Sequence, residues 1–574
     1  MAKTIAIGKQ DFREMIIGNY FYIDKTAFIK EWWENGDDVT LITRPRRFGK
    51  TLTMSMTEQF FSVKYAGCRK VFEKLNIWKE EKYQNLQGTY PVISLSFAGI
   101  KENTYAKTRQ SICQLLVNLY ADHRFLLEGE ILAEVEKDFF ERVSAKMDDI
   151  TAVFALYQLS GYLSRYYGKK VIILLDEYDT PMQEAYVNGY WDEFVPFSRS
   201  LFNHTFKTNP YLERAVMAGV TRVSKESIFS DLNNLTVITT TSNMYETVFG
   251  FTEDEVFYAL EQFGMQDKMA DVKQWYDGFR FGTHENIYNP WSIINFLKFK
   301  ELKTFWANTS SNQLIDKLMR KNGIGTMYIM EDLLNGGSFY AQIDEEIIFS
   351  QLDDDIDAVW SLLLAGGYLK VSGFRKNKRY QKDYIFSLTN MEIRSVFDKM
   401  VKSWFSLKEY KYHDFSDALL SGNIEFMNEY LNAVANETFS YFDTGSNVLA
   451  FKKSENFYHG FILGLIADLR ELYYITSNRE SGKGRYDVMM EPRNPDTDDG
   501  IILEFKVLES ETERALCDTV QSALSQIISK NYILNLEIKG ISKDRIRIYG
   551  FAFQGKKVLI NGGPIQELLM ESGE

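Results

Sequence analysis

Apolar residues in the first third of the chain gather in short, nearly continuous runs, separated by longer stretches with helical spacing. The runs fall at residues 38–43, 91–97, 170–175, 213–220 and 235–240. The stretches between them, such as residues 51–64 and 103–165, have the apolar spacing of helices. Strands that are apolar on both faces and alternate with helices are typical of a parallel sheet. This region is therefore predicted to form a parallel α/β fold.

The middle of the chain, residues 250–430, is predicted to be mostly helical, with one exception. Residues 358–370 predict a helix and a turn, and a charged segment from Phe374 to Lys382 follows them. That segment leads into a further strand and a helix. Helix, strand, basic hairpin, strand and helix in this order are compatible with a winged-helix module.

The last third predicts a second α/β domain. A helix around residues 454–473 precedes three strands, YYITSN, RYDVMM and IILEFKV. A helix around residues 511–530 then precedes IRIYGFAF and a short hairpin. This αβββαβ order again combines helices with one sheet. The expected division into sheet domain, helical lid, winged-helix-like region and C-terminal domain is 1–245, 246–330, 331–435 and 436–574.

Composition narrows the classes of function. Of 574 residues, 45% are hydrophobic and 25% charged, which excludes wholesale disorder. The 66 basic and 79 acidic residues give a net charge of −13, which argues against a protein that coats polyanions indiscriminately. The three cysteines are far apart, and no apolar run reaches the roughly 18–20 residues that span a bilayer. A reducing, cytoplasmic location without membrane association is expected.

The segment RPRRFGKT, residues 44–51, lies between a predicted strand and a predicted helix. Gly-x₄-Gly-Lys-Ser/Thr is the phosphate-binding loop pattern, and here Arg44 replaces the first glycine. Backbone N–H groups of the loop would attract phosphate oxygens, Lys50 would reach the β- and γ-phosphates, and Thr51 would bind Mg²⁺. The alternative is a chance Gly-Lys-Thr in a surface turn. The residues expected at the nucleotide are Arg47, Phe48, Gly49, Lys50 and Thr51.

Two further predicted strands end in side chains that could act on a nucleotide phosphate. In LLDEYD, residues 174–179, Asp176 would hold Mg²⁺ through water and Glu177 would polarise an attacking water. In AGVTRVS, residues 218–224, Thr221 and Arg222 are candidates to face the γ-phosphate. The strand at 91–97 suggests that another strand is inserted between the two sites. The alternatives are a strand that ends in exposed acids and an arginine in a surface ion pair.

A second candidate site lies in the C-terminal domain. Glu504 and Lys506 alternate along one predicted strand and so share a face, and Asp487 can meet them if the two strands form a hairpin. Two carboxylates form a hard-oxygen Mg²⁺ site, and the lysine can orient a water or stabilise a phosphate. Glu455 could add a carboxylate, and Gln526 lies on the following helix. The alternative is an amphipathic hairpin with solvated charges.

Six cations lie within residues 370–382, with no acid among them and with Phe374 and Tyr380 interleaved. Such a strip can grip backbone phosphates and stack a base, or it can be a solvated hairpin tip. The segment 344–357 carries seven acids that could pair with it.

Several of these pieces resemble a known family. FREMIIGNYFYIDKT, RPRRFGKT, LLDEYDTP, GVTRVS and YDGFRFG…YNPWSI, over residues 5–300, resemble the AAA-ATPase-like family of STAND-related P-loop NTPases. The form RPRRFGKT is usual in that family. The resemblance implies ATP binding at Lys50, Thr51 and Asp176, with Glu177 as the base, and it lends support to Arg222.

The C-terminal pieces SENFYHGFILGLI, GRYDVMM, ILEFKV and ALSQIISKNY resemble the PD-(D/E)XK nuclease superfamily, in the branch fused behind that ATPase. The resemblance implies a restriction-endonuclease-like fold with Asp487, Glu504 and Lys506 as the catalytic core. Glu455 and Gln526 take supporting positions. Tyr486 stands where the superfamily name has proline.

The combined hypothesis is a multidomain α/β protein that binds ATP and Mg²⁺ and cuts nucleic acid under nucleotide control. The expected partners are nucleic acid, DNA in the first place, and further copies of the chain. One rival is a nucleotide-gated scaffold whose C-terminal domain binds without cutting. The other is a STAND-like signalling ATPase that oligomerises with ATP.

Overall fold

The computed structural model of the chain divides into two compact units. Unit 1 comprises Met1–Lys321 and Gly336–Val396, and unit 2 comprises Asn322–Asn335 and Phe397–Glu574. The backbone is described for residues 3–221, 229, 232–306, 318–319, 329–330, 332–334, 336–343, 352, 355–376, 382–404, 412–438, 458, 462–463, 465–477, 480–481, 484–508, 513, 515 and 516–571.

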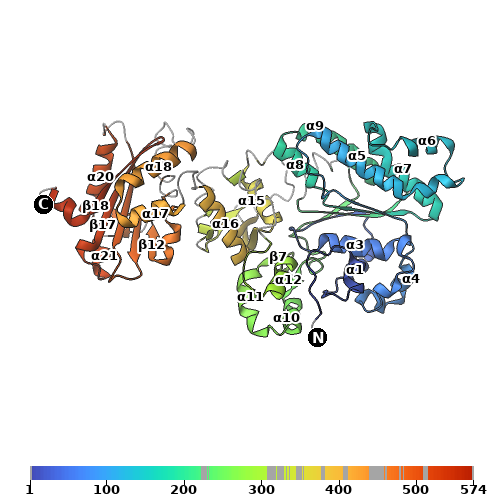
Figure 1. Cartoon of the computed structure of the whole chain (residues 1–574), viewed down its shortest axis with the longest axis horizontal. Coiled ribbons are helices and arrows are strands. Elements are labelled where there is room, and N and C mark those ends of the chain that lie inside the picture. The colour runs from blue at the N-terminus through green and yellow to red at the C-terminus, as the bar shows by residue number, and fades with distance from the viewer. Residues whose placement is uncertain are drawn as a thin grey trace. The chain divides into compact units, whose positions relative to one another are not determined.

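Unit 1 is built on a five-stranded parallel sheet, as predicted (Figure 1). Its strands, in spatial order, are β2 (Val92–Ser96), β3 (Val171–Asp176), β4 (Leu212–Gly219), β1 (Val39–Thr43) and β5 (Leu235–Ile238). Every residue of β1 and β3 is buried, because helices cover both faces of the sheet.

An inserted strand does separate the two predicted motifs, but it is not the strand at 91–97. The strand between β1 and β3 is β4, and β2 lies at the edge of the sheet. The order of strands along the chain does not give their order in the sheet. The chain can pass over the position beside a strand, and a later strand, here β4, then occupies that position.

Helices α1 (Phe12–Ile17) and α3 (Lys50–Phe61) lie on one side of the sheet in Figure 1, and α5, α7, α8 and α9 lie on the other. Helix α7 shows how the sequence sets such elements: the Asp148 side chain accepts a hydrogen bond from the Thr151 N–H at its start, and Gly168 ends it with φ 65°. The bounds of the remaining helices of this part are α2 (Ala27–Asn35), α4 (Glu81–Leu86), α5 (Tyr105–Asp122), α6 (Glu134–Arg142), α7 (Asp149–Tyr167), α8 (Thr180–Asn188) and α9 (Trp191–Phe202).

The segment after the sheet forms a hydrophobic core around Tyr276 and Phe296, to which Phe21 and Ile23 from before the sheet also contribute. It contains helices, as predicted, and also an antiparallel sheet in the order β6-β8-β7 that the pattern did not predict. Strands of two to five residues are too short to show alternation. The elements are β6 (Phe251–Thr252), α10 (Glu253–Gln262), α11 (Met269–Tyr276), β7 (Phe279–Phe281), β8 (His284–Tyr288) and α12 (Pro290–Phe299).

The predicted helix–hairpin–helix follows in α15 (Ile356–Ala365), β10 (Leu369–Lys376), β11 (Lys382–Leu388) and α16 (Met391–Trp404). Strand β9 (Phe339–Ala341) pairs with β11 and completes a three-stranded sheet. The helix and the hairpin thus follow one another in the predicted order, and the winged-helix assignment stays a prediction.

Unit 2 contains a five-stranded sheet in the order β12-β15-β16-β17-β18, in which only β16 and β17 run parallel. Three strands, a helix and a further strand follow one another as predicted. Of the predicted helix at 454–473, residues 454–457, 459–461 and 464 lie outside the described residues. Its described end is the 3₁₀ helix η10 (Ala467–Glu471), and Tyr473 already begins β12. The elements are α17 (Tyr412–Ser421), α18 (Ile424–Thr438), β12 (Tyr473–Ser477), β13 (Glu480–Ser481), β14 (Gly484–Arg485), β15 (Val488–Pro492), β16 (Gly500–Val507), α20 (Leu516–Ser529), α21 (Leu534–Ile538), β17 (Ile546–Gln554), β18 (Lys557–Pro564) and α22 (Ile565–Glu571).

Helix α18 covers the edge strand of this sheet. The Asn428 side chain donates to the Ile560 carbonyl at 2.8 Å and accepts from the Ile560 N–H at 2.8 Å. One turn later, Asn432 makes the same two bonds to Val558, at 2.8 and 3.0 Å. These amides occupy backbone groups that an exposed edge would present to another chain.

The predicted α/β fold class is thus confirmed in both units. The domain boundaries drawn from the sequence stay predictions. Within the described parts of the chain, no helix is both long enough and apolar enough to cross a bilayer.

Candidate functional site

The loop between β1 and α3 has the backbone conformation of an anion-binding turn. Gly49 immediately precedes the helix with φ 85°, in the left-handed region. A Cβ on Gly49 would meet no atom within 4 Å, so the backbone angle rather than space requires glycine there. Arg47 also has a positive φ of 66°. The N–H groups at the start of α3 are therefore presented at the mouth of the loop.

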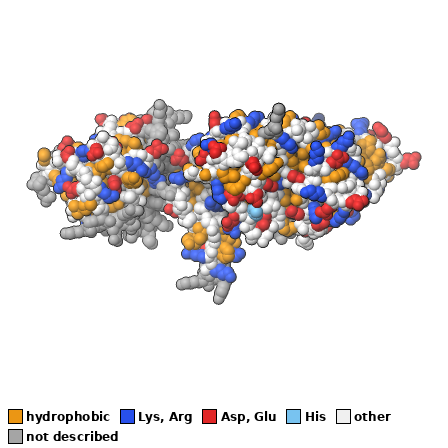
Figure 2. Space-filling model, turned by 90° about the horizontal axis from the view of Figure 1, so that it is seen from below, with side chains coloured by type: hydrophobic (Ala, Val, Ile, Leu, Met, Phe, Trp, Pro, Cys, Tyr) orange, Lys and Arg blue, Asp and Glu red, His pale blue; other side chains and the backbone are white. Residues whose placement is uncertain are grey.

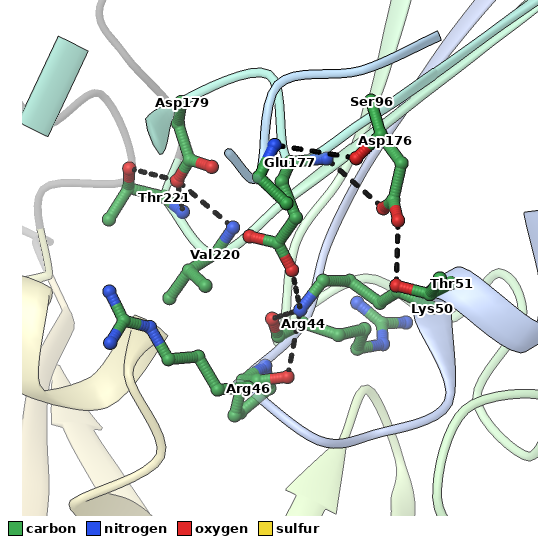
Figure 3. Close-up of polar contacts among 12 residues, drawn as sticks. Arg44, Arg46, Lys50, Thr51, Ser96, Asp176, Glu177, Asp179, Val220 and Thr221 are labelled. Atoms are coloured by element: carbon green, nitrogen blue, oxygen red, sulfur yellow. Dashed lines mark hydrogen bonds and ion pairs between the residues drawn. The ribbon is translucent and has the colours of Figure 1, made fainter. Parts of the chain in front are cut away.

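The four residues predicted to handle phosphate and metal do come together (Figure 3). The Thr51 hydroxyl donates to Asp176 Oδ2 at 2.6 Å, across the end of β3. Lys50 is almost fully buried and donates to the carbonyls of Arg44 and Pro45, both at 3.0 Å. Its Nζ lies 3.8 Å from Glu177 Oε1.

The two carboxylates differ in surroundings. Burial raises the pKa of Asp176 to about 6, and the Thr51 hydrogen bond opposes that rise. Glu177 is more exposed and adopts a positive φ of 51°, an unusual angle for a residue with a side chain. A hydroxyl, a carboxylate, an ammonium group and backbone N–H groups in one place fit a nucleotide phosphate with Mg²⁺.

Arg44 has a different role from the one its charge suggested. A cation in a phosphate-binding loop would be expected to face the phosphates, but the Arg44 side chain is fully buried. The guanidinium donates to the carbonyls of Thr43 (2.9 Å) and Thr239 (2.6 Å) and lies 4.5 Å from the Phe281 ring centre. Burial lowers its pKa to about 9. Arg44 therefore anchors the base of the loop and does not face its mouth.

Residues of the segment that follows the sheet contact the loop between β1 and α3 and support its conformation. The buried Phe48 ring packs edge-on against Phe279 and Phe281, with ring centres 4.8 and 5.4 Å away. Asn289 donates to the Arg46 carbonyl at 3.2 Å, and the Arg47 guanidinium lies 4.5 Å from the Trp291 ring centre. These partners belong to YDGFRFG and YNPWSI. Both motifs therefore support the loop conformation.

A residue that the sequence analysis did not single out joins two parts of the site. Asp179 is fully buried, and its Oδ2 accepts from Val220 N–H (3.0 Å), Thr221 N–H (2.8 Å) and the Thr221 hydroxyl (2.8 Å). Gln183 also donates to Oδ2, at 3.0 Å, and accepts from the Arg46 side chain at 3.2 Å. This clamp connects the end of β4 with the turn after β3 and with the loop (Figure 3).

The clamp corrects one expectation. Thr221 was a candidate to face the γ-phosphate, but its hydroxyl is buried and donates to Asp179. Arg222 lies outside the described residues. The signal for Asp179 was its position, three residues beyond Asp176 and at the start of α8. Nothing in the sequence shows that its carboxylate turns inward.

The second candidate site forms on the predicted hairpin. Strands β15 and β16 are antiparallel with Val488 opposite Leu503, and Asp487 Oδ2 accepts from the Phe505 N–H at 2.8 Å. Glu504 is buried on β16, and the Gln526 amide of α20 donates to its Oε1. Lys506 is half-buried two residues along the same strand face.

Asp487, Glu504, Lys506 and Gln526 are thus brought to one end of the hairpin. Glu455 lies outside the described residues. Within the described set, no group of three or more histidine, cysteine or acidic residues is placed to hold a metal ion. The two carboxylates that are placed have the hard oxygen atoms that Mg²⁺ favours.

The basic strip divides between the two faces of the β10–β11 hairpin. Arg375 pairs with Asp383 at 3.4 Å, whereas Lys382 lies 4.8 Å from the Phe374 ring centre. Lys378, Arg379 and Tyr380 lie outside the described residues, as does most of the acidic segment at 344–357. On the face of the molecule shown in Figure 2, acidic and basic side chains are interspersed.

Comparison with known proteins agrees with this geometry. Residues 6–229 match the family described as predicted AAA-ATPase, and residues 453–562 match the PD-(D/E)XK nuclease superfamily. The chain joins an AAA-ATPase-like domain to a PD-(D/E)XK nuclease superfamily domain. The predicted fusion is therefore confirmed.

A relative from Azotobacter chroococcum mcd 1, described as an uncharacterised protein in the vnfD 5′ region, is 25% identical over 405 residues. The match covers 68% of this chain and 69% of the relative. The two domain matches leave residues 230–452 between them. That interval includes the strands and the helix that hold the phosphate loop of the AAA-ATPase-like domain.

Proposed function

We propose that the protein binds and hydrolyses ATP with Mg²⁺ in its AAA-ATPase-like domain, and that its PD-(D/E)XK domain cuts nucleic acid, DNA in the first place, under control of the nucleotide. The observation that carries the proposal is the meeting of Lys50, Thr51, Asp176 and Glu177 at the end of two parallel strands.

In the first domain, Thr51 and Asp176 are the residues that would hold Mg²⁺, which would neutralise phosphate charge when bound. Lys50, released from the loop carbonyls, would reach the β- and γ-phosphates. N–H groups of Arg47, Phe48 and Gly49 would cradle them. Glu177 would orient the attacking water and accept its proton, and Arg222 would contact the γ-phosphate.

An apolar pocket beside the loop supports a nucleoside ligand. Its walls include Gly49, Leu52 and Thr53 of the loop and α3, and Tyr22 and Ile294 from segments before and after the sheet. We assign the base of ATP to this pocket, because the faces of a flat ring can pack on its apolar walls while the phosphates lie at the loop.

In the second domain, Asp487 and Glu504 would hold Mg²⁺, with Glu455 as an added ligand. The metal would activate a water and neutralise charge at the scissile phosphate. Lys506 would orient that water, and Gln526 would fix the Glu504 carboxylate. We also expect a reducing, cytoplasmic compartment from the dispersed cysteines.

The ATP site is tested by titrating ATP and Mg²⁺ calorimetrically into the full chain. Lys50→Ala should weaken ATP binding about 100-fold, since it removes a charge-assisted contact to phosphate. Lys30→Ala, which removes an exposed lysine paired with Glu80, should bind ATP as the wild type does. Unchanged binding by Lys50→Ala would contradict the assignment.

The nuclease site is tested with labelled single- and double-stranded DNA and RNA, in Mg²⁺ or Mn²⁺, with and without ATP. Asp487→Asn should slow cleavage by about 1,000-fold, because it removes a carboxylate from the proposed metal site. Asp496→Asn, an exposed position of the same domain, should cleave normally. Absence of cutting by the wild type under all conditions would favour a nucleotide-gated scaffold. A size change with ATP alone would favour a signalling ATPase.

A further inference from the structure

A cavity of about 260 Å³ lies in unit 1, apart from the phosphate-binding mouth of the loop. Its walls come from the β10–β11 hairpin, from β7 and the turn after it, and from Pro45. Among the residues that the structure describes, four aromatic side chains and three cationic side chains line it, and none of these lining residues is acidic. The chemistry of the wall therefore suits a ligand that is both flat and anionic.

The hairpin supplies the outer wall. Phe374 and Tyr384 lie directly opposite each other in the register, with ring centres 6.1 Å apart. Lys382, two residues before Tyr384, lies with its Nζ 4.8 Å from the Phe374 ring centre. Phe374 is 53% exposed, so much of its ring surface is open to a partner.

The opposite face of the same small sheet is chemically different. There Arg375 pairs with Asp383 and lies 3.8 Å from the ring centre of Tyr340. The positive charge of that face is therefore matched by a carboxylate, whereas the cavity face carries cations and open rings. Variants on the cavity face of the hairpin can therefore be compared with matched variants on its opposite face.

Two of the three cavity cations are available to an anion. Arg280 pairs with Glu285 at 3.0 Å. Within the described part of the chain, no carboxylate lies within ion-pair distance of Lys370 or Lys382. Burial raises the pKa of Asp277, and the charge of Lys370 opposes that rise, but Asp277 is not part of the cavity wall.

We propose that this cavity binds one unpaired nucleotide of a nucleic acid strand, with its base against Phe374 and its phosphate at Lys370 and Lys382. Aromatic side chains stack on bases of any sequence, and nearby cations follow the backbone. An unpaired base is required, because a base within a duplex is already stacked on its neighbours. The inference rests on the proposed function in that nucleic acid is the expected substrate.

The cavity also touches the nucleotide-binding loop. Pro45 belongs to both, and a Cβ on Gly367 at the start of the hairpin segment would lie 2.9 Å from Pro45 Cγ. Contact this close leaves little room for the loop and the cavity wall to move independently. Binding of the strand and of ATP should therefore be linked, and the linkage must be reciprocal.

The test is fluorescence anisotropy of a labelled 12-nucleotide oligo(dT) strand with the full chain, in the Asp487→Asn background so that the strand is not cut. Phe374→Ala should weaken binding about tenfold through loss of stacking. Lys382→Gln should reduce the slope of log affinity against log salt by about 0.7. The matched controls, Tyr340→Ala and Arg375→Gln on the opposite face, should bind as the parent does.

Three results would overturn the inference: equal losses on both faces, no loss from the cavity variants, or displacement of the strand by an equal concentration of thymidine monophosphate. The last would indicate a site for a free nucleotide. Cleavage by the wild type together with unaffected binding by the cavity variants would leave the proposed function standing. Binding that depends on the cavity without any cleavage would reject the nuclease and retain this site.

Discussion

The two candidate catalytic sites differ in where their support comes from. In the PD-(D/E)XK domain, Asp487 and Glu504 take their hydrogen bonds from Phe505 and Gln526, 18 and 22 positions along the chain. In the AAA-ATPase-like domain, the loop is fixed by Thr239 and Asn289, 195 and 243 positions from the residues they contact. The RPRRFGKT loop is therefore not self-sufficient, because its conformation depends on residues beyond the matched AAA-ATPase-like domain.

The largest effect is expected when Arg44, which anchors the loop to distant residues, is replaced by the glycine of the common loop pattern. Arg44→Gly should lower the free energy of unfolding by about 3 kcal/mol, since buried carbonyls lose their donor and the loop gains freedom. Urea denaturation of the full chain, followed by the fluorescence of tryptophan, measures the change. Arg46→Ala, which loses one hydrogen bond to Gln183, should cost less than about 1 kcal/mol. Higher stability or tighter ATP binding in Arg44→Gly would show that the distant anchors are dispensable.

The hydrogen bonds of Asp179 span an intermediate distance along the chain, because Val220 and Thr221 lie about forty positions away. We therefore expect an intermediate loss of stability when Asp179 is changed. Asp179→Asn should cost about 2 kcal/mol of stability, since the amide cannot accept all the bonds that converge on Oδ2. ATP turnover should fall more than ATP affinity, because the clamp positions the end of β4 rather than the loop mouth. Asp122→Asn, an exposed position at the end of α5, serves as the control for urea denaturation and turnover. Equal behaviour of the two variants would mean that the clamp has no energetic role.

The smallest effect is expected in the PD-(D/E)XK domain, where the residues of the candidate site are supported by neighbours close in sequence. Gln526→Leu should weaken Mg²⁺ or Mn²⁺ binding about tenfold, because Glu504, a carboxylate of the proposed metal site, loses the donor that orients it. The melting temperature should change little, since α20 keeps its apolar contacts with the sheet. Metal titration monitored by calorimetry gives the affinity, with Gln521→Leu on the exposed face of α20 as the control. A large loss of stability with unchanged metal affinity would assign Gln526 to packing.

The difference between contacts close in sequence and contacts far apart in sequence also determines what could be predicted from the sequence. Lys50 and Thr51 could be singled out because Gly-Lys-Thr lies between a predicted strand and a predicted helix, and Asp176 because it ends an apolar strand. The carboxyl ends of parallel strands lie at one edge of a sheet, which is why the two motifs meet there. Asp487 and Glu504 were found because strand alternation fixes the face of a side chain. The inward turn of Arg44 and of Asp179 could not be predicted, because their partners are set by tertiary contacts far along the chain. The order of the parallel strands was missed for the same reason.

The pair of asparagines on α18 has a practical consequence for anyone who studies the nuclease domain alone. The matched domain begins at residue 453, after Asn428 and Asn432. A fragment that starts there would leave the backbone groups of Val558 and Ile560 uncovered along the outer strand. Such a fragment should self-associate through that strand, whereas one that begins before Tyr412 should self-associate less at the same concentration. Oligomers of the shorter fragment would then reflect where the chain was cut and not the biology of the full-length protein.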